Sequence, residues 1–327
     1  MPLGPITPKD RPAGQRFAFG SAHAESKSDG WSRHVQMNSS ANEYGIPTFG
    51  SLRISSLTAS HSAREFIKVL EQYPEDTVFV DLFGGSGLLS HIAKCQKPNA
   101  TVVYNDFDNY RLRLENIPRT NVLLADLRAI VGDMPKHSCI KGEKRDLIFA
   151  RLEQEEREYG YIDFITVSSA LMFSMKYKLS IPEMKKEALY NNIRKADYPP
   201  SADYLEGITI VSADYKEVFR QYKDTPNVVF LVDPPYLSTE VGTYSMYWKL
   251  ADYLDVLTIL AGHQFIYFTS NKSSIVELCD WLGKNPTVGN PFKNCRKVEF
   301  NATMNYNAHY TDMMFYTQKE EQHRIAV

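Results

Sequence analysis

One short stretch combines an acid, two prolines and an aromatic ring. Asp233-Pro234-Pro235-Tyr236 directly follows Val228–Val232, an apolar and mostly β-branched run typical of a strand that is buried on both faces. Neither proline can donate to a β-ladder, so the chain must leave the sheet at the edge where open α/β sheets bind ligands. The tetrapeptide therefore predicts a functional site at the mouth of a crevice, although Asp-Pro-Pro alone could simply end a strand.

A glycine-rich turn is the second candidate. Residues 78–87 read VFVDLFGGSG, so a short apolar strand runs into Gly84, Gly85 and Gly87, and a helical pattern begins at Leu88. Glycines at such a turn permit positive φ and let the backbone approach a ligand in front of a helix N-terminus. The spacing matches neither G-x-G-x-x-G nor a P-loop, which disfavours dinucleotide and P-loop sites. Many α/β loops carry glycines, so this turn alone is weak evidence.

Two further acids follow predicted strands. Asp106 comes after the strand 101–104 and lies 25 residues beyond Asp81, where α/β folds often hold a ribose by its hydroxyls. The alternative is that Asp106 caps a helix or lies in a loop. Asp214 follows a strand at 207–212 and could accept a hydrogen bond from an exocyclic amine. Together with the glycine turn, these acids would form a site for a nucleoside-bearing cofactor.

The elements that must position these residues alternate between strands and helices. This pattern predicts an α/β fold with a doubly wound, Rossmann-like and mostly parallel sheet. A final strand pair, 298–304 and 313–316, is expected to add an antiparallel edge. Further helices are expected at 60–72, 88–94, 216–222, 250–261 and 275–282, with a strand at 263–269. Ser62 and Glu65 have the spacing of a capping box and predict that the first helix begins at Ser62.

A mixed basic and aromatic segment interrupts this alternation. Residues 111–195 hold 16 Lys and Arg against 12 Asp and Glu, in a chain whose net charge is −2. Such a composition suits phosphate contacts and stacking on bases, although solvated helix faces would look much the same. Residues 189–196 are expected to be helical. We therefore expect a loosely ordered arm at 1–43, a catalytic domain at 44–110 and 201–327, and an inserted region at 111–200.

Composition excludes several classes of protein. The chain has 327 residues, of which 43% are hydrophobic and 23% charged, as in an ordinary globular protein. Its four cysteines form no CxxC pair, which argues against a zinc site or a disulfide framework and suits a reducing cytosol. The sequence contains neither an apolar run of about 18 residues nor a signal peptide, so we expect a cytoplasmic protein without a membrane partner.

Six motifs, taken in order, resemble the S-adenosylmethionine-dependent adenine-N6 DNA methyltransferases of the Dam type. The resemblance covers about residues 58–318 and rests on residues 81–87 (DLFGGSG), Asp106, 212–215 (SADY), 233–236 (DPPY), 268–271 (FTSN) and 311–314 (TDMM). In that family the cofactor motif comes first, a target-recognition insertion next and the catalytic motif last, as here. The initial Asp of the tetrapeptide fits adenine, because cytosine-N4 enzymes usually have Ser there, and protein-glutamine or many RNA enzymes have Asn. The glycine-lysine element of the family has no good match near residues 49–53 or 58–61.

The resemblance implies S-adenosylmethionine as cofactor, S-adenosylhomocysteine as product, double-stranded DNA as partner and no metal. The residues that it implicates in catalysis are Asp233, Pro234, Pro235 and Tyr236; those implicated in cofactor binding are Asp81, Phe83, Gly84, Gly85, Asp106, Phe107, Asp214 and Tyr215; those implicated in substrate binding are Tyr244, Tyr247 and Asn271. The insertion has no pattern that maps onto known target readers, and its composition alone makes Lys185, Lys186 and Arg194 candidates for substrate binding.

The chemistry expected is direct methyl transfer to an adenine flipped out of the duplex, with low or short sequence specificity. Only Arg194, Asn191 and Asn192 in the late insertion look able to read base edges. Two alternatives are methylation of adenine in RNA or single strands, and a catalytically dead nucleic-acid-binding module.

Overall fold

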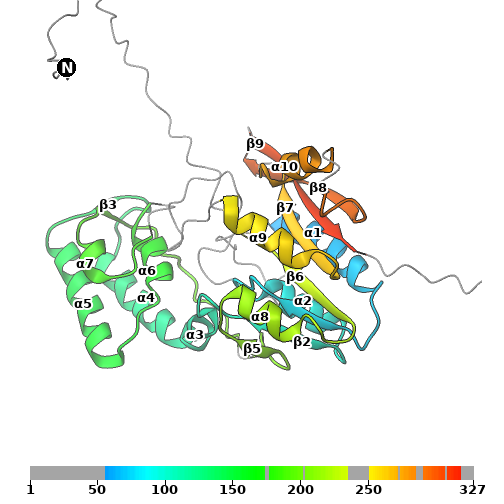
Figure 1. The fold of residues 1–327 in the computed structure, drawn as a ribbon. Coiled ribbons are helices and arrows are strands. Elements are labelled where there is room, and N and C mark those ends of the chain that lie inside the picture. Colours follow the sequence, from blue (N-terminus) through cyan, green and yellow to red (C-terminus); the bar gives the residue numbers. More distant parts are fainter. Residues whose placement is uncertain are drawn as a thin grey trace, which may run out of the picture.

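A seven-stranded sheet forms the centre of the larger lobe (Figure 1). The computed structural model describes residues 56–173, 177–201, 203–234, 250–271, 273–284, 290–305 and 308–317. The strand order is β5-β2-β1-β6-β7-β9-β8. The strands are β1 (Val78–Asp81), β2 (Thr101–Asn105), β5 (Thr209–Val211), β6 (Val228–Val232), β7 (Phe265–Ser270), β8 (Arg296–Asn305) and β9 (Ala308–Tyr316). The first five in this order are parallel, whereas β9 pairs antiparallel with β7 and β8. The predicted mostly parallel sheet with an antiparallel edge is confirmed.

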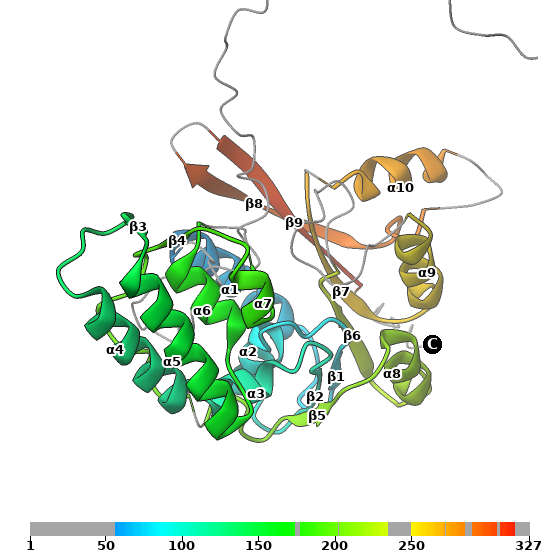
Figure 2. The same cartoon turned by 90° about the vertical axis from the view of Figure 1, so that its left-hand side faces the viewer.

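Helices cover both faces of this sheet, because alternate residues of its central strands point to opposite sides. Val229 and Leu231 of β6 pack with α1 (Ser56–Leu70) and α2 (Leu88–Gln96). Phe230 and Val232 pack on the other face, where the helices are α8 (Tyr215–Tyr222), α9 (Leu250–Leu260) and α10 (Ile275–Gly283). Figure 2 shows α8 and α9 across the strands from α2. Every residue of β6 is buried, as its unbroken apolar run predicts.

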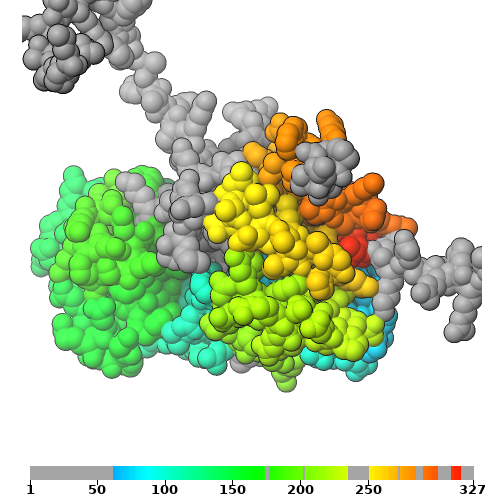
Figure 3. Space-filling view, viewed as in Figure 1, coloured from blue at the N-terminus to red at the C-terminus, as the bar shows by residue number. Residues whose placement is uncertain are grey.

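A helical lobe lies beside the sheet (Figure 3, green). It contains α3 (Tyr110–Glu115), α4 (Ile117–Val131), α5 (Glu143–Tyr159), α6 (Phe164–Leu171), α7 (Ile181–Met184) and a small antiparallel pair, β3 (Cys139–Ile140) with β4 (Leu189–Tyr190). Its hydrophobic core is made of buried residues between Tyr110 and Tyr204. The helical lobe therefore has a core of its own, distinct from those on the two faces of the sheet.

Two local predictions were wrong. Residues 189–196 do not form a helix: Leu189 and Tyr190 form β4, and the chain then continues as a loop. The Asn191 side chain donates to Met134 O at 2.8 Å and its backbone N–H donates to Ser138 O at 3.0 Å, so distant contacts override local helix propensity. Ser62 is not the first residue of α1, which begins at Ser56, so Ser62 lies within the helix.

None of the helices within the described ranges is both long and apolar enough to cross a bilayer.

Candidate active site at the carboxyl ends of the strands

Four acids follow four adjacent parallel strands at one edge of the sheet. Asp81 ends β1, and its register partner in β6 is Leu231, two residues before Asp233. Asp106 follows β2 directly, and Asp214 is the N-cap residue of α8, close behind β5. Because the carboxyl ends of parallel strands meet at the same edge, the topology brings together the acids that the sequence places far apart.

The carboxylate of Asp81 is fully buried. Ser90 Oγ, on α2, donates to Asp81 Oδ2 at 2.8 Å, whereas Asp81 Oδ1 has no hydrogen-bond partner among the residues that the structure describes. The pKa of Asp81 is raised from its ordinary value of 3.8 to about 7, mainly by burial and also by repulsion from Asp233. The Ser90 hydroxyl and the backbone N–H groups of Phe83 and Ser90 act in the opposite direction. The site therefore contains a buried acceptor that lacks a donor and an acid that can change charge near neutral pH.

The glycine turn serves two different needs. At Gly84, a Cβ atom would lie 2.2 Å from Tyr104 Cε2, so the bare backbone is required by a side chain of β2. Gly85 has φ +49° and is exposed, and a Cβ there would meet only Phe83 O, at 3.8 Å. The Tyr104 hydroxyl donates a hydrogen bond to Gly85 O at 2.8 Å and so holds the turn against β2. Of these two glycines, Gly85 is the one whose backbone is open to a ligand.

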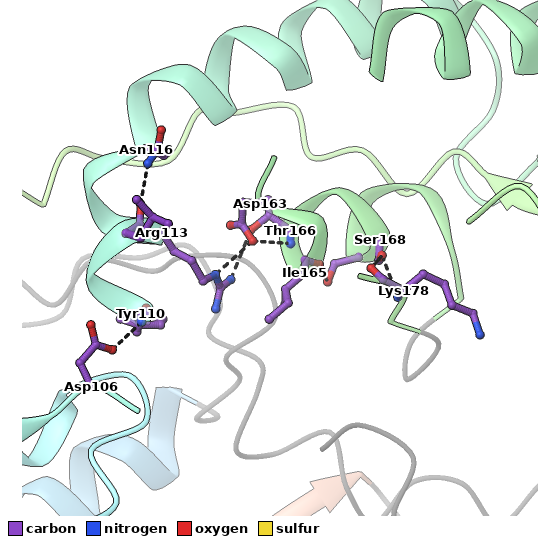
Figure 4. A network of polar contacts seen from close by, with 11 residues as sticks. Asp106, Tyr110, Arg113, Asn116, Asp163, Ile165, Thr166, Ser168 and Lys178 are labelled. Atoms are coloured by element: carbon purple, nitrogen blue, oxygen red, sulfur yellow. Dashed lines mark hydrogen bonds and ion pairs between the residues drawn. The ribbon is translucent and has the colours of Figure 1, made fainter. Parts of the chain in front are cut away.

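Asp106 is buried and already accepts hydrogen bonds from its own chain. Tyr110 N donates to its Oδ1 at 2.5 Å and Arg111 N donates to its Oδ2 at 3.0 Å, so Asp106 binds the first N–H groups of α3 (Figure 4). The Tyr104 hydroxyl lies 3.0 Å from Oδ1. Oδ1 has two donors within hydrogen-bond distance, whereas Oδ2 accepts one bond and keeps a further lone pair for a ligand hydroxyl. The helix-capping role is observed, and ribose binding stays a prediction.

Asn105 links three strand ends, a role that the sequence did not predict. Its Nδ2 lies 3.0 Å from both Leu82 O and Ala213 O, and its Oδ1 accepts from Ala213 N at 3.1 Å. The side chain is buried and so ties the ends of β1 and β5 to β2. A polar residue at the end of an apolar strand is the only sequence signal for this role, and it does not reveal the partners.

The remaining predicted cofactor residues lie around the turn. The rings of Phe83 and Tyr215 are 5.0 Å apart, which joins the end of β1 to the start of α8. Burial raises the pKa of Tyr215 to about 12, so its hydroxyl stays protonated at neutral pH. Asp214 accepts from Lys216 N at 2.8 Å and thereby caps α8. Phe107 is 51% exposed after β2. These positions agree with an aromatic-lined site, but no bound ligand tests them.

The catalytic tetrapeptide is only partly described. Asp233 is half-buried and Pro234 is buried at the end of β6. Asn271 accepts from Thr311 N through its Oδ1 at 3.0 Å, and its own N–H donates to Thr311 O at 2.9 Å, so it extends the pairing of β7 with β9. The other predicted catalytic and substrate residues at this edge, Pro235, Tyr236, Tyr244 and Tyr247, lie outside the described residues.

Residues 62–258 match the family of D12 class N6 adenine-specific DNA methyltransferases. The chain belongs to this family. It is also 33% identical over 246 residues to a Haemophilus influenzae protein named "Putative methyltransferase", a match that covers 74% of this chain and 82% of the relative. Among solved structures, an rRNA methylase from Streptococcus thermophilus has 11% identity and a TM-score of 0.31, over 79% of this chain and 97% of that one. A precorrin-6y C5,15-methyltransferase from Geobacter metallireducens has 10% identity and a TM-score of 0.30, over 82% and 92% of the two chains.

Membership of the D12 class makes this chain an N6 adenine-specific DNA methyltransferase by family, and the family implies S-adenosylmethionine as cofactor and DNA as substrate. The resemblance found in the sequence is thereby confirmed at the level of family, enzyme class and methyltransferase chemistry. The individual site residues remain predictions.

The predicted DNA contacts of this methyltransferase lie on the helical lobe. Lys185 follows α7 and forms an ion pair with Glu153 of α5, with 2.6 Å between Nζ and Oε1. Lys186 beside it is exposed. Arg194 lies in the loop after β4, where its guanidinium carbon is 3.9 Å from the centre of the Tyr198 ring. These three residues therefore belong to the helical lobe, whereas the candidate acids lie at the ends of the strands.

A buried ion pair joins the first helix of this lobe to its centre. Arg113 Nε on α3 lies 3.1 Å from Oδ1 of Asp163, the N-cap residue of α6 (Figure 4). Thr166 N also donates to Asp163 Oδ1, at 3.2 Å. Because Asp106 binds the other end of α3, one short helix connects the edge of the candidate active site to α6.

Within the described ranges, no group of three or more His, Cys, Asp or Glu side chains is arranged to hold a metal ion.

Proposed function

We propose that this methyltransferase transfers a methyl group from S-adenosylmethionine to the N6 amine of adenine in double-stranded DNA. The observation that carries the proposal is the position of Asp233, which follows the buried strand β6 beside Asp81 and the glycine turn in a chain of the D12 family. Asp233 at this edge is adjacent to the region suited to the cofactor, so the methyl donor and the adenine that accepts the methyl group can meet there.

The residues present fit such a cofactor. Asp81 offers a buried carboxylate oxygen that lacks a donor, and Gly85 presents an exposed backbone at positive φ. In our proposal Asp106 accepts from the ribose hydroxyls and Asp214 from the exocyclic amine of the cofactor. Phe83, Phe107 and Tyr215 provide the apolar walls around its base. When bound, S-adenosylmethionine supplies a methyl group on a positively charged sulfur.

Asp233 acts on the adenine. The exocyclic amine of adenine is a poor nucleophile because its lone pair is delocalised into the ring. Asp233 accepts one N–H bond of this amine and a main-chain carbonyl of the prolines accepts the other, which returns electron density to the nitrogen as it becomes tetrahedral. In this proposal no side chain forms a covalent bond to the substrate: the nitrogen gains the methyl group as the bond from methyl to sulfur breaks, and the methylated amine then loses one proton to solvent. The alignment of the two reactants supplies much of the acceleration.

The adenine must leave the duplex before it can reach Asp233, which costs a few kcal/mol of lost stacking and pairing. We propose that Tyr236 stacks on the flipped base, with Tyr244 or Tyr247 on its other face. We assign residues 44–110 and 201–327 to catalysis and residues 111–200 to target binding. Lys185, Lys186 and Arg194 would contact phosphates or bases from the helical lobe, which has its own core.

The test supplies S-adenosylmethionine with a labelled methyl group to the full chain, together with duplex DNA, single-stranded DNA or RNA that contains adenine. We expect label in N6-methyladenine, with duplex DNA as the best substrate. Asp233→Ala is the inactive control, and Asp224→Asn is the matched control because Asp224 is an exposed acid beyond the opposite end of β6. Label found only in RNA or single strands would show that the substrate assignment is wrong.

A further inference from the structure

Asp81 is a buried acid whose second carboxylate oxygen has no partner among the described residues. A buried charge without a partner costs several kcal/mol, and an acid in that position usually avoids this cost by holding a proton. Protonation would leave the Ser90 hydrogen bond intact, because Ser90 Oγ donates to Oδ2 at 2.8 Å. The unpartnered oxygen could then carry the proton.

The groups that face Asp81 supply no positive charge. From β6 the neighbour is Asp233, which repels a negative Asp81. Tyr104 on β2 and Tyr204, in the segment that returns from the helical lobe, also interact with it, and burial raises the pKa of both phenols, so they are neutral. On α2 the neighbours are the Ser90 hydroxyl and the Ser90 backbone N–H, and the Phe83 backbone N–H also interacts with the carboxylate. These neutral donors lower the pKa of Asp81, but burial and Asp233 outweigh them. The balance of these groups favours the protonated acid, in agreement with its pKa of about 7.

We infer that Asp81 holds a proton in the free enzyme and releases it when the cofactor binds, so that one buried carboxylate receives either a proton or a positive charge of the cofactor. This inference rests on the proposed cofactor site. The O–H bond of Asp81 breaks, the proton passes to solvent, and the carboxylate that remains is compensated by the ligand. The shared ligand chemistry is a cation, either the ammonium or the sulfonium of S-adenosylmethionine.

Cofactor affinity must then depend on pH. Below about pH 7 binding has to displace a proton, so the dissociation constant should rise roughly tenfold for each unit by which the pH falls. Above that pH the carboxylate of Asp81 is already ionised and contributes no further change of affinity with pH. The α-carboxyl group of the cofactor ordinarily titrates far below this range, whereas its α-amino group ordinarily titrates at about 7.7–8.0, so the proton exchange of Asp81 is measured below pH 7.

Isothermal titration calorimetry measures this exchange directly. S-adenosylmethionine is titrated into the full chain in two buffers of equal pH and different ionisation enthalpy, so that the difference in heat reports the protons released. We expect about one proton released per cofactor near pH 6. Near pH 8.5 Asp81 should release none, and the α-amino group of the cofactor takes up a proton there if it binds as an ammonium. S-adenosylhomocysteine has the ammonium but not the sulfonium, so release with both ligands assigns the ammonium, and release with S-adenosylmethionine alone assigns the sulfonium.

Three variants isolate Asp81. Asp81→Asn should release no proton near pH 6, and its affinity for the cofactor should no longer fall as the pH drops from 7 to 6. Asp233→Asn removes the repelling charge and should move the midpoint of proton release to lower pH while binding is retained. His91→Gln should release the proton as the unchanged chain does; it is included because an imidazole can titrate near neutral pH and His91 stacks on Tyr204.

Two outcomes would overturn the inference in different ways. Cofactor binding with the same heat in both buffers at pH 6, or proton release that persists in Asp81→Asn, would refute the exchange and leave the proposed function intact. Absence of cofactor binding at pH 8.5 would refute the proposed function and this inference together.

Discussion

The ring of Tyr104 fills the space beside the Gly84 backbone. A Cβ at position 84 would lie 2.2 Å from Tyr104 Cε2 and 2.8 Å from Asn105 O, closer than such contacts occur. The glycine of this turn is therefore required by the packing of β1 against β2. The hydroxyl of the same side chain lies 2.8 Å from Gly85 O, so Tyr104 contacts the backbone at both glycines.

Gly84→Ala should lower the free energy of unfolding by about 1–3 kcal/mol, the usual cost of an overpacked site, and should weaken cofactor binding. Urea unfolding and calorimetry measure the two effects. Gly142→Ala is the contrasting variant: Gly142 has φ +59° and nothing within 4 Å of a Cβ, so it reports backbone strain without crowding, whereas Gly84 has crowding without a positive φ. Equal stability of Gly84→Ala and the unchanged chain would contradict the packing role.

Asp233→Ala should abolish methyl transfer, with a loss of about 100-fold or more, as for the removal of a group that acts on charge in a transition state. Cofactor affinity should change little, because Asp233 acts on the adenine. Asp233→Asn retains a carbonyl acceptor and should keep more activity than Asp233→Ala. Single-turnover rates and calorimetry measure these effects, and near-normal turnover of Asp233→Ala would be incompatible with the mechanism.

Asp106→Ala should have two separate effects. Loss of a charged acceptor for the ribose should weaken cofactor binding by about 1.5–3 kcal/mol, and loss of the bonds to Tyr110 N and Arg111 N should destabilise α3. Calorimetry measures the first effect and thermal unfolding the second. A variant with reduced stability and unchanged cofactor affinity would identify Asp106 as a helix cap alone.

The cofactor-free chain should lose stability as the pH rises from about 4 to about 7. The pKa of Asp81 is 3.8 without the fold and about 7 within it, so the folded chain binds this proton more tightly than the unfolded chain. The stabilisation is therefore present at low pH and is lost as the pH rises through the folded value. Asp81→Asn should lack this dependence of stability on pH, and at pH 8 it should be more stable than the unchanged chain by a few kcal/mol. Urea unfolding of both chains at pH 5 and pH 8 checks the difference, and equal slopes with pH would contradict it.

Sequence selectivity should be low. Asn191 is buried and donates to Met134 O at 2.8 Å, and Asn192 Nδ2 donates to Met172 O at 2.8 Å, so two of the three base readers expected from the sequence are engaged within the protein. Lysines such as Lys185 and Lys186 bind phosphate without reading sequence. Mapping of methylated adenines across a plasmid should show a short or degenerate target, and DNA binding should weaken steeply with salt. Modification confined to one site of about four or more base pairs would be inconsistent with this expectation.

The order of the motifs and the strand ends could be read from the sequence. The apolar run before Asp233 and the glycines after Asp81 are local signals, because burial on both faces and positive φ each demand particular residue types at that point of the chain. These signals were sufficient for the sheet and for the convergence of the acids, since parallel strands all end at one edge.

Only the tertiary structure decided which partners these residues have. The unpartnered oxygen of Asp81, the Tyr104 ring beside Gly84 and the bridge made by Asn105 each depend on groups from other strands or helices. The loop at Asn191 is held by Met134, 57 residues away, against a local pattern that favours a helix. Such contacts are set by the packing of distant segments, and neither residue type nor spacing along the chain encodes them locally.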